Sequence, residues 1–244
     1  MSKVRILLLN LFLALLLSCG TVKEGKRQNV TTSSNYSMVF VKGGTAKVGI
    51  EGSGHKEEKV KDFFIGETEV TQKLWKEIMG ENPSCFKGDD LPVENVSWND
   101  CQEFIHRLNV KTGQNYRLPT VVEWEYAICN TNYKSCDFFD GNLLNNMIQC
   151  LYNNKPEANI YPHGVMQGNP NKIGLYGMED NVWEWCSDGE NNMGYTHGMD
   201  LNEYKIIKGV VKDNGNSEMK YIIRYPFHCG SRSGLLGLRL VLDK

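Results

Sequence analysis

The sequence lacks an excess of charge of either sign. It contains 27 Lys and Arg residues against 29 Asp and Glu residues, a formal net charge of −2. Removal of residues 1–18 would take away Lys3 and Arg5 and leave a charge of −4. Proteins that bind nucleic acid instead concentrate positive charge on one face or segment. We therefore expect no nucleic-acid partner.

Several catalytic signatures are missing as well. The sequence has no G-x-S-x-G nucleophile elbow and no glycine-rich phosphate loop. Its five histidines show no metal-ligand spacing. These absences exclude a serine hydrolase of the nucleophile-elbow type and give no support to a site in which histidines hold a metal.

The N-terminus reads as an export signal. A short basic start is followed by an apolar run from Ile6 to Leu17, interrupted only by Asn10. This run is too short to cross a membrane comfortably, and the Ser18-Cys19 sequence after it resembles the end of a bacterial lipoprotein signal. We predict that residues 1–18 are a signal peptide and that lipidated Cys19 is the membrane anchor. The protein would then lie in the bacterial cell envelope, with the outer membrane favoured over the inner one. The alternative is an ordinary cleaved signal that leaves Cys19 free.

The rest of the chain divides into a tether and one domain. Residues 19–37 are polar with almost nothing to bury, which predicts a flexible tether. Residues 38–244 have the length of a single domain. Apart from Cys19 the sequence has seven cysteines, an odd number, so at least one thiol is unpaired or bonded to another molecule.

Periodicity and capping residues predict short elements. Thr71 and Gly80 bound one helix, Ser97 and Gly113 bound a second, and a third covers residues 119–128. The first strands form a hairpin around Gly43-Gly44, built from residues 38–43 and 46–49. Further strands are predicted at residues 63–70, 116–118, 206–211, 221–224 and 236–242.

The aromatic segment Ile173–Asp188 is the predicted centre of the domain. Trp183 and Trp185 flank Glu184, and a carboxylate in such a place needs a cation, an arginine or backbone donors. Arg117 and Arg239 are the candidate arginines. The competing interpretation is a calcium ion, because Asp180, Asn181 and nearby carbonyls are hard oxygen ligands.

A second carboxylate pair flanks Trp124. Glu123 and Glu125 suggest an acid/base pair, but helix capping by Glu123 and an ion pair of Glu125 with Arg117 are simpler explanations. Cys101, at helical spacing with its apolar neighbours, is predicted to be a core or disulfide residue rather than a nucleophile.

The segment from Cys129 to Pro170 shows no lasting helical or strand periodicity. A loop of this length in a compact domain needs cross-links or bound ions to hold it in place. Cys129, Cys136 and Cys150 are available for disulfides. Asn153 and Asn154, with Glu157 and Asn159, could offer oxygen ligands to a second cation.

Six ordered motifs resemble those of the formylglycine-generating enzyme family, the sulfatase-modifying factor domain. They are MVFVKGG, FFIGETEVTQKLW, LPVENVSW, YRLPTVVEWEYA, IGLYGMEDNVWEW and GLRLVLD, and they run from about Met38 to Asp243. The resemblance implies an α+β, loop-rich fold of the C-type-lectin type, with little regular secondary structure and bound calcium. It favours a metal at Glu184, whose carboxylate would bind calcium together with backbone oxygens of Glu179, Asp180 and Val182.

The same resemblance bears on the cysteines. It implies a structural disulfide between Cys129 and Cys229, which would stabilise the domain by roughly 4 to 5 kcal/mol in the chain-entropy model. A nucleophilic Cys229 would have only His228 as a nearby base. The pairing of Cys85, Cys101, Cys136, Cys150 and Cys186 stays open.

Catalytic members of the family oxidise a cysteine of a sulfatase peptide, using copper held by two cysteines five residues apart. Counting back from Cys229, these positions fall on Arg224 and Met219, and neither is a thiolate. The turn before them is also changed, to Lys208-Gly209-Val210-Val211. We therefore expect no copper and no catalytic residues of that kind.

The preferred hypothesis is a lipid-anchored, non-catalytic binding or assembly module. Its partner would be a protein, a peptide or another envelope ligand, contacted by residues 191–204 and 214–232. The alternative is an active formylglycine-generating oxidase whose copper uses a pair among Cys85, Cys186 and Cys229. The iron-dependent sulfoxide synthases that share this domain are disfavoured, because they need a histidine-bearing helical domain upstream.

Overall fold

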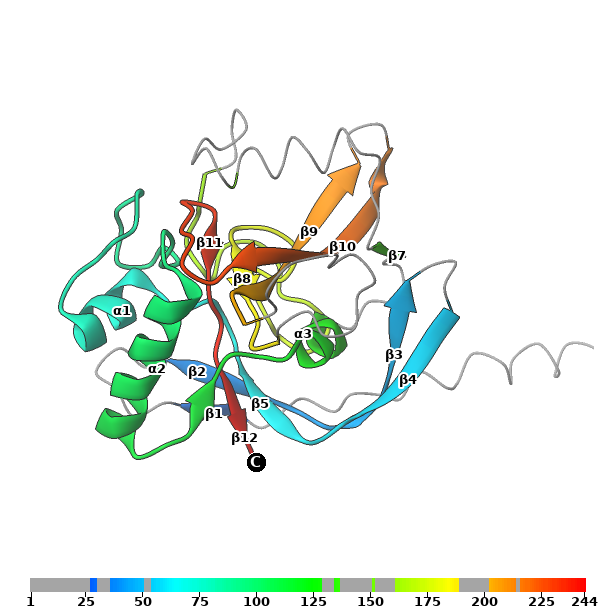
Figure 1. The fold of residues 1–244 in the computed structure, drawn as a ribbon, viewed down its shortest axis with the longest axis horizontal. Coiled ribbons are helices and arrows are strands. Elements are labelled where there is room, and N and C mark those ends of the chain that lie inside the picture. The colour runs from blue at the N-terminus through cyan, green and yellow to red at the C-terminus, as the bar shows by residue number, and fades with distance from the viewer. Residues whose placement is uncertain are drawn as a thin grey trace, which may run out of the picture.

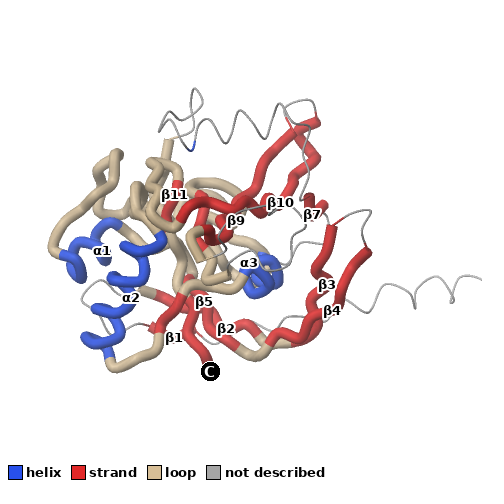
Figure 2. The backbone as a smooth tube through the Cα atoms, viewed as in Figure 1, coloured by secondary structure: helices blue, strands red, loops and turns tan. Residues whose placement is uncertain are grey.

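The computed structural model describes residues 27–29, 36–50, 54–128, 134–136, 151, 161–188, 202–213 and 216–244. Two five-stranded sheets and a two-stranded hairpin are joined by long loops, and the helices are short (Figures 1 and 2). The elements are β1 (Arg27–Asn29), β2 (Ser37–Val41), β3 (Gly44–Ile50), β4 (Gly54–Val60), β5 (Phe63–Gly66), α1 (Gln72–Met79), α2 (Trp98–Thr112), β6 (Tyr116–Arg117), α3 (Val121–Ile128), β7 (Lys134–Cys136), β8 (Trp183–Trp185), β9 (Tyr204–Asp213), β10 (Asn216–His228), β11 (Leu236–Gly237) and β12 (Val241–Asp243). This mixed, loop-rich architecture confirms the predicted fold class.

The first sheet brings the two ends of the domain together. Its strand order is β1-β2-β5-β12-β6, with antiparallel neighbours throughout. The C-terminal strand β12 therefore lies between β5 and β6, where Val241 faces both Ile65 and Arg117 across the ladders. Because β12 is central, the C-terminal segment that precedes it is held deep in the domain.

The second sheet carries the aromatic segment. Its order is β11-β8-β9-β10-β7, and the long β9–β10 hairpin extends away from the rest of the domain (Figure 1). Strand β8 runs parallel to β11 and antiparallel to β9, so that Glu184 is paired with Lys208 in the register. The short strand β8 is thus enclosed on both edges.

The helices begin and end where the sequence predicts. The side chain of Thr71 accepts a hydrogen bond from the Leu74 N–H, and Gly80 ends α1 in the left-handed conformation. Ser97 and Asp100 form a complete capping box at the start of α2, which ends at left-handed Gly113. Only glycine takes this conformation without strain, which is why both helices stop there.

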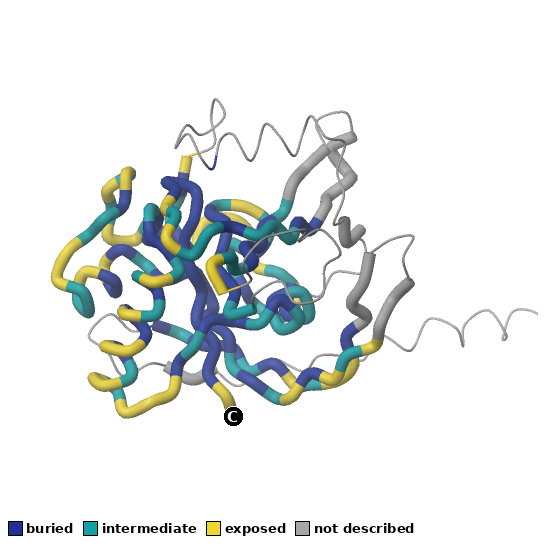
Figure 3. The backbone as a smooth tube through the Cα atoms, viewed as in Figure 1, coloured by how far each residue is buried: buried dark blue, intermediate teal, exposed yellow. Residues whose placement is uncertain are grey.

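The core has two parts. Trp75 of α1 and Phe104 of α2 stack at a ring-centroid distance of 4.8 Å in the larger cluster. A second cluster lies under α3, around Trp124 and Ile65. Figure 3 shows buried backbone through the middle of the domain and exposed positions along the outer side of α2. Among the described residues, no helix is long and apolar enough to cross a membrane.

Two predictions about the N-terminal part differ from the structure. The predicted hairpin around Gly43-Gly44 is wrong, because β2 pairs with β1 and β5 while β3 pairs with β4. The folded part also begins before residue 38, since β1 joins the sheet and Tyr36 is buried. β1 is polar and is held at the sheet edge by main-chain pairing, which leaves no hydrophobic pattern in the sequence.

Candidate functional site

Glu184 lies at the centre of a buried polar network. It is only 1% exposed, on a strand enclosed by β9 and β11. Arg239 donates to it from Nε and Nη2, at 3.0 and 2.9 Å from Oε1, and the indole of Trp124 donates to Oε2 at 2.7 Å. Of the two arginines that the sequence offered, Arg239 is the partner. The carboxylate is fully buried.

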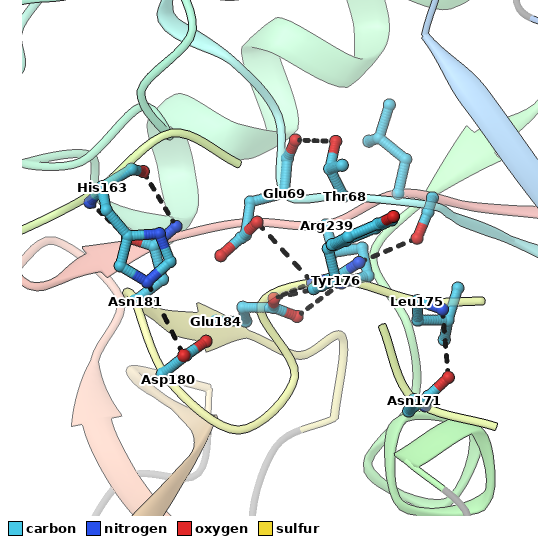
Figure 4. A network of polar contacts seen from close by, with 12 residues as sticks. Thr68, Glu69, His163, Asn171, Leu175, Tyr176, Asp180, Asn181, Glu184 and Arg239 are labelled. Atoms are coloured by element: carbon cyan, nitrogen blue, oxygen red, sulfur yellow. Dashed lines mark hydrogen bonds and ion pairs between the residues drawn. The ribbon is translucent and has the colours of Figure 1, made fainter. Parts of the chain in front are cut away.

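Arg239 also fixes the end of β5 and the aromatic segment to this centre. Its guanidinium donates to the carbonyl of Gly66 at 2.8 Å. It also donates to the carbonyl of Tyr176 at 2.7 Å, and Figure 4 shows Arg239 beside Tyr176 and Glu184. Burial works against its charge, but Glu184 and Glu69 raise the pKa of Arg239, so it stays a cation. Arg239 thus holds together the end of β5, the aromatic segment and the C-terminal segment.

Glu69 is the member of the network that the sequence analysis missed. Its side chain is fully buried, and its Oε2 lies 3.9 Å from Arg239 Nη2. Among the described residues, no donor lies within hydrogen-bond geometry of either carboxylate oxygen. Burial raises the pKa of Glu69 to about 8, and Arg239 only partly opposes this. The signal in the sequence is weak, because a glutamate near a strand end is ordinarily exposed.

The other residues predicted for calcium lie around the same turn. Val182 is buried and Glu179 is half-buried. Asp180 is more exposed and lies 3.6 Å from His163 Nε2. Asn181, at a φ of 68°, makes two hydrogen bonds to the His163 backbone. Asn153 and Asn154 lie outside the described residues.

Whether calcium could bind here depends on which oxygen atoms are free to act as ligands. Both oxygens of Glu184 already accept hydrogen bonds from Arg239 and Trp124, so its side chain fits a cation poorly. The oxygens of Glu69 are buried and accept no hydrogen bond from the described residues, which leaves them available to a cation. Within the described residues no group of three or more His, Cys, Asp or Glu side chains could hold a metal, so carbonyl oxygens would have to supply the other ligands. When bound, calcium would neutralise negative charge and hold the turn in place.

A second charged cluster joins α3 to the β9–β10 hairpin. Arg224 donates to both oxygens of Glu125 at 2.5 Å, and Lys208 donates to Oε1 at 2.8 Å. The Lys208 side chain is fully buried, that of Arg224 is 8% exposed and that of Glu125 is 12% exposed. Burial alone would raise the pKa of Glu125, but Lys208 and Arg224 lower it to about 2. We call these three residues the Glu125 cluster.

The partner predicted for Glu125 is wrong. Arg117 instead pairs with Glu123 at 2.7 Å and with Asp243 at 2.6 Å. Glu123 also caps α3 through the Thr120 N–H, as predicted. Helical positions two residues apart lie on different faces of the helix. Glu123 and Glu125 therefore face separate partners and form no acid/base pair.

The identity of residue 224 affects whether this chain could bind copper. By resemblance it corresponds to a metal-binding thiolate, and here it carries a guanidinium that is tied to Glu125. A permanent cation does not fit copper(I), which prefers paired thiolates. The backbone of Met219, the other position, lies in β10, but its side chain is outside the described part.

Four of the described cysteines differ in burial. Cys101 and Cys186 are buried, Cys85 is exposed and Cys229 is half-buried. Burial raises the pKa of both Cys101 and Cys186, which makes them poor ligands and nucleophiles. Within the residues described, no three of the Cys, His, Asp and Glu side chains form a metal group. Cys101 is a core residue, as predicted.

The Cys229 thiol faces Asn99 Nδ2 at 3.9 Å. Its predicted disulfide partner, Cys129, lies outside the described residues, as does Cys19. The Nδ1 atom of His228 accepts a hydrogen bond from the Gly230 N–H, so that nitrogen is engaged with the backbone. The disulfide and the lipid anchor therefore stay predictions.

Comparisons with known proteins agree with this geometry. The family model described as "Sulfatase-modifying factor enzyme 1-like domain" matches residues 23–244. A protein of Paenibacillus barcinonensis named "Chaperone protein LppX" is 31% identical over 206 residues, covering 65% of this chain and 72% of that protein. The mouse formylglycine-generating enzyme is 31% identical over 180 residues, covering 65% of this chain but only 44% of the enzyme.

A solved structure supports the fold alone. The Treponema denticola variable protein 1 superposes with a TM-score of 0.66 at 21% identity, covering 90% of this chain and 99% of that one.

Proposed function

The chain belongs to the sulfatase-modifying factor enzyme 1-like domain family, and from this premise we propose that it is a non-catalytic member. The proposed role is that of a cell-envelope lipoprotein, anchored through Cys19, whose domain acts as a binding or assembly module. Its partner is a protein, a peptide or another envelope ligand.

The observation that carries this proposal is the clamp between Arg224 and Glu125. A catalytic copper site needs two thiolates that can approach a soft metal. In this chain one of the two positions is an arginine whose guanidinium makes two hydrogen bonds to a largely buried carboxylate. Release of that arginine would leave Glu125 without one of its two partners, at a cost of several kcal/mol. The cluster therefore supports the proposal that no copper is held at this position.

The relatives give a second line of support. One relative is named a chaperone, which is a binding role. The match covers 72% of that protein's own length but only 44% of the length of the mouse enzyme. The lipoprotein part of the proposal rests on the N-terminal sequence that ends at Ser18-Cys19.

The base of the β9–β10 hairpin is the described part of the expected ligand surface. Tyr204 and His228 are paired in the ladder, and their rings meet edge to face at 5.6 Å. Beside them, Lys205 lies 4.9 Å from the centre of the Trp98 ring. This group joins aromatic rings to a cation on a fixed backbone, an arrangement that suits contact with a peptide.

A turnover assay tests the proposal against an active oxidase. The full chain is purified in detergent, reduced, loaded with copper(I) and given oxygen with a Cys-x-Pro-x-Arg peptide, and aldehyde is read by mass spectrometry. We expect an intact peptide, with an active family enzyme as the positive control. Aldehyde above the no-enzyme control would overturn the proposal.

Copper binding by a paired variant checks the assignment of positions. M219C/R224C places two thiols where the resemblance puts the metal ligands. We expect this variant to bind copper(I) in a competition titration and the original chain not to. Stoichiometric copper in the original chain would instead direct attention to Cys85, Cys186 and Cys229.

A further inference from the structure

The first sheet begins close to the proposed lipid anchor. Strand β1 starts at Arg27, so residues 20–26 separate Cys19 from the sheet. A chain of this length spans at most about 28 Å even when it is fully extended. A domain of about 200 residues has a radius of gyration of about 17 Å, so this tether is shorter than the domain is wide. With Cys19 in a membrane, the bilayer therefore lies near the place where β1 begins.

The strand register shows which end of the first sheet this is. β1 and β2 are antiparallel, and Arg27 is paired with Val39 near the end of β2. Val41 at the end of β2 is paired with Phe63 at the start of β5, and Phe63 is also paired with Asp243 at the end of β12. The start of β1 therefore shares one end of the sheet with these three positions. The C-terminus, labelled at the bottom of Figure 1, marks this end.

Three lysines gather at the same end of the sheet. Lys42 follows β2, Lys61 lies two residues before β5, and Lys244 follows β12. Lys42 and Lys61 are exposed, and neither forms an ion pair with another described residue. The Lys244 side chain is 59% exposed and pairs with Asp62 at 3.0 Å. We call these three lysines the basic end of the first sheet.

The acidic side chains next to these lysines in the sequence are already engaged. Asp62 accepts hydrogen bonds from the Gly43 N–H at 2.9 Å and from Lys244, and both donors lower the pKa of Asp62. Asp243 accepts a hydrogen bond from Arg117 at 2.6 Å. The two lysines without an ion pair therefore present uncompensated positive charge, in a chain whose formal charge after residue 18 is −4.

A half-buried aromatic pair lies beside the basic end. Phe40 and Phe64 are paired across the β2–β5 ladder, and their ring centroids are 5.4 Å apart. The ammonium group of Lys244 lies 5.2 Å from the centre of the Phe40 ring. Aromatic rings beside lysines are typical of protein surfaces that meet a bilayer, because the rings enter the apolar boundary and the ammonium groups reach the phosphates.

We propose that the basic end of the first sheet is the surface by which the domain rests on the membrane, with Lys42 and Lys61 contacting the phosphates of anionic phospholipids. This inference rests on the proposed anchor at Cys19 and adds an orientation to it. The anchor and the lysines lie on the same side of the domain, so both hold that side near the bilayer. The β9–β10 hairpin extends towards the opposite side in Figure 1, so it points away from the membrane.

Lysine footprinting on vesicles tests the orientation. The full chain is purified in detergent and diluted onto preformed vesicles of phosphatidylcholine, with or without phosphatidylglycerol. Exposed lysines are acetylated with a water-soluble reagent and mapped by mass spectrometry, which also reports the lipid on Cys19. We expect the lysines of the basic end to react about fivefold more slowly on the anionic vesicles than on the neutral ones. Lys73 and Lys87, exposed on α1 and the loop after it, are the internal reference and should not change.

The outcomes separate this inference from the proposed anchor. A lipid on Cys19 together with unprotected lysines at the basic end overturns the inference and leaves the anchor in place. Absence of a lipid on Cys19 overturns the anchor, and the inference falls with it. Equal protection on neutral and anionic vesicles overturns the contact with anionic headgroups.

A charge variant tests the two lysines directly. In K42Q/K61Q we expect Lys244 to lose its protection on anionic vesicles, because the attraction that holds this end against the headgroups is removed. K73Q/K87Q loses the same charge around α1 and should keep Lys244 protected. All four substituted positions are exposed, so both variants should fold, which a melting curve checks. Protection of Lys244 that survives in K42Q/K61Q refutes the role of the two lysines.

Discussion

Arg224 holds Glu125 with a pair of hydrogen bonds, Nε to Oε1 and Nη2 to Oε2, both at 2.5 Å. The contact links β10 to α3 across 99 residues of sequence, and Lys208 of β9 adds a third side chain. The result is an electrostatic joint between the long hairpin and the helix. By the resemblance, Arg224 stands where a catalytic relative would carry a metal-binding thiolate; in this chain the same position makes a structural contact instead.

Removal of the Glu125 charge should strongly destabilise the domain. In E125Q two largely buried cations lose their carboxylate, and we expect the free energy of unfolding to fall by about 3 to 5 kcal/mol. E103Q breaks an exposed pair with Arg107 and should change it by no more than about 0.5 kcal/mol. Urea unfolding of both variants measures the difference. Equal effects would show that the buried cluster contributes little.

The Glu125 cluster should also set an acid limit to stability. The pKa of Glu125 is lowered to about 2, below its ordinary 4.5. As the pH falls, the unfolded chain is protonated first, so the stabilisation is complete above about pH 5 and is lost progressively towards pH 2. The difference in unfolding free energy between the original chain and E125Q should shrink over that range. A difference that is constant from pH 7 to pH 3 would contradict the assignment.

The reactivity of Cys85 should depend on Glu94. Burial raises the pKa of the Cys85 thiol, and the neighbouring Glu94 carboxylate raises it further. Burial in turn raises the pKa of Glu94 to about 6, so this side chain is charged at pH 7.5. We expect E94Q to speed alkylation of Cys85 by iodoacetamide by about two- to tenfold at that pH. Peptide mapping measures the rate, and E103Q, an exposed change on α2, is the control variant. A slower reaction in E94Q would reverse the sign of the proposed effect.

Two glycines with positive φ should respond differently to alanine. G177A adds a methyl group that clashes with Glu69, and G168A adds one with nothing within 4 Å. Both pay the backbone cost of the left-handed conformation, about 1 kcal/mol. Only G177A must also displace a buried carboxylate, so we expect its total loss to reach about 3 kcal/mol or more. Calorimetry of the two variants measures this, and similar losses would mean that Glu69 moves away easily.

Local elements of this protein follow from the sequence. Thr71, Gly80, Ser97 and Gly113 mark the helix ends, because a cap depends on residues within one turn of each other. The six ordered motifs likewise indicate the family and the loop-rich fold, which the family match and the structure confirm. The aromatic segment is central, as its composition predicts.

Only the tertiary structure decided which charges meet. Sequence narrowed the partner of Glu184 to two arginines, and the course of the C-terminal segment selected Arg239. Glu125 forms ion pairs with Arg224 and Lys208, because β9 and β10 bring these two side chains to the face of α3 that carries Glu125. Glu69 gave only a weak signal, because a turn more than 100 residues later in the chain lies against its carboxylate. Caps and periodicity are short-range properties, whereas the partner of a buried charge depends on how distant segments are brought together, and a pattern within one segment does not record that.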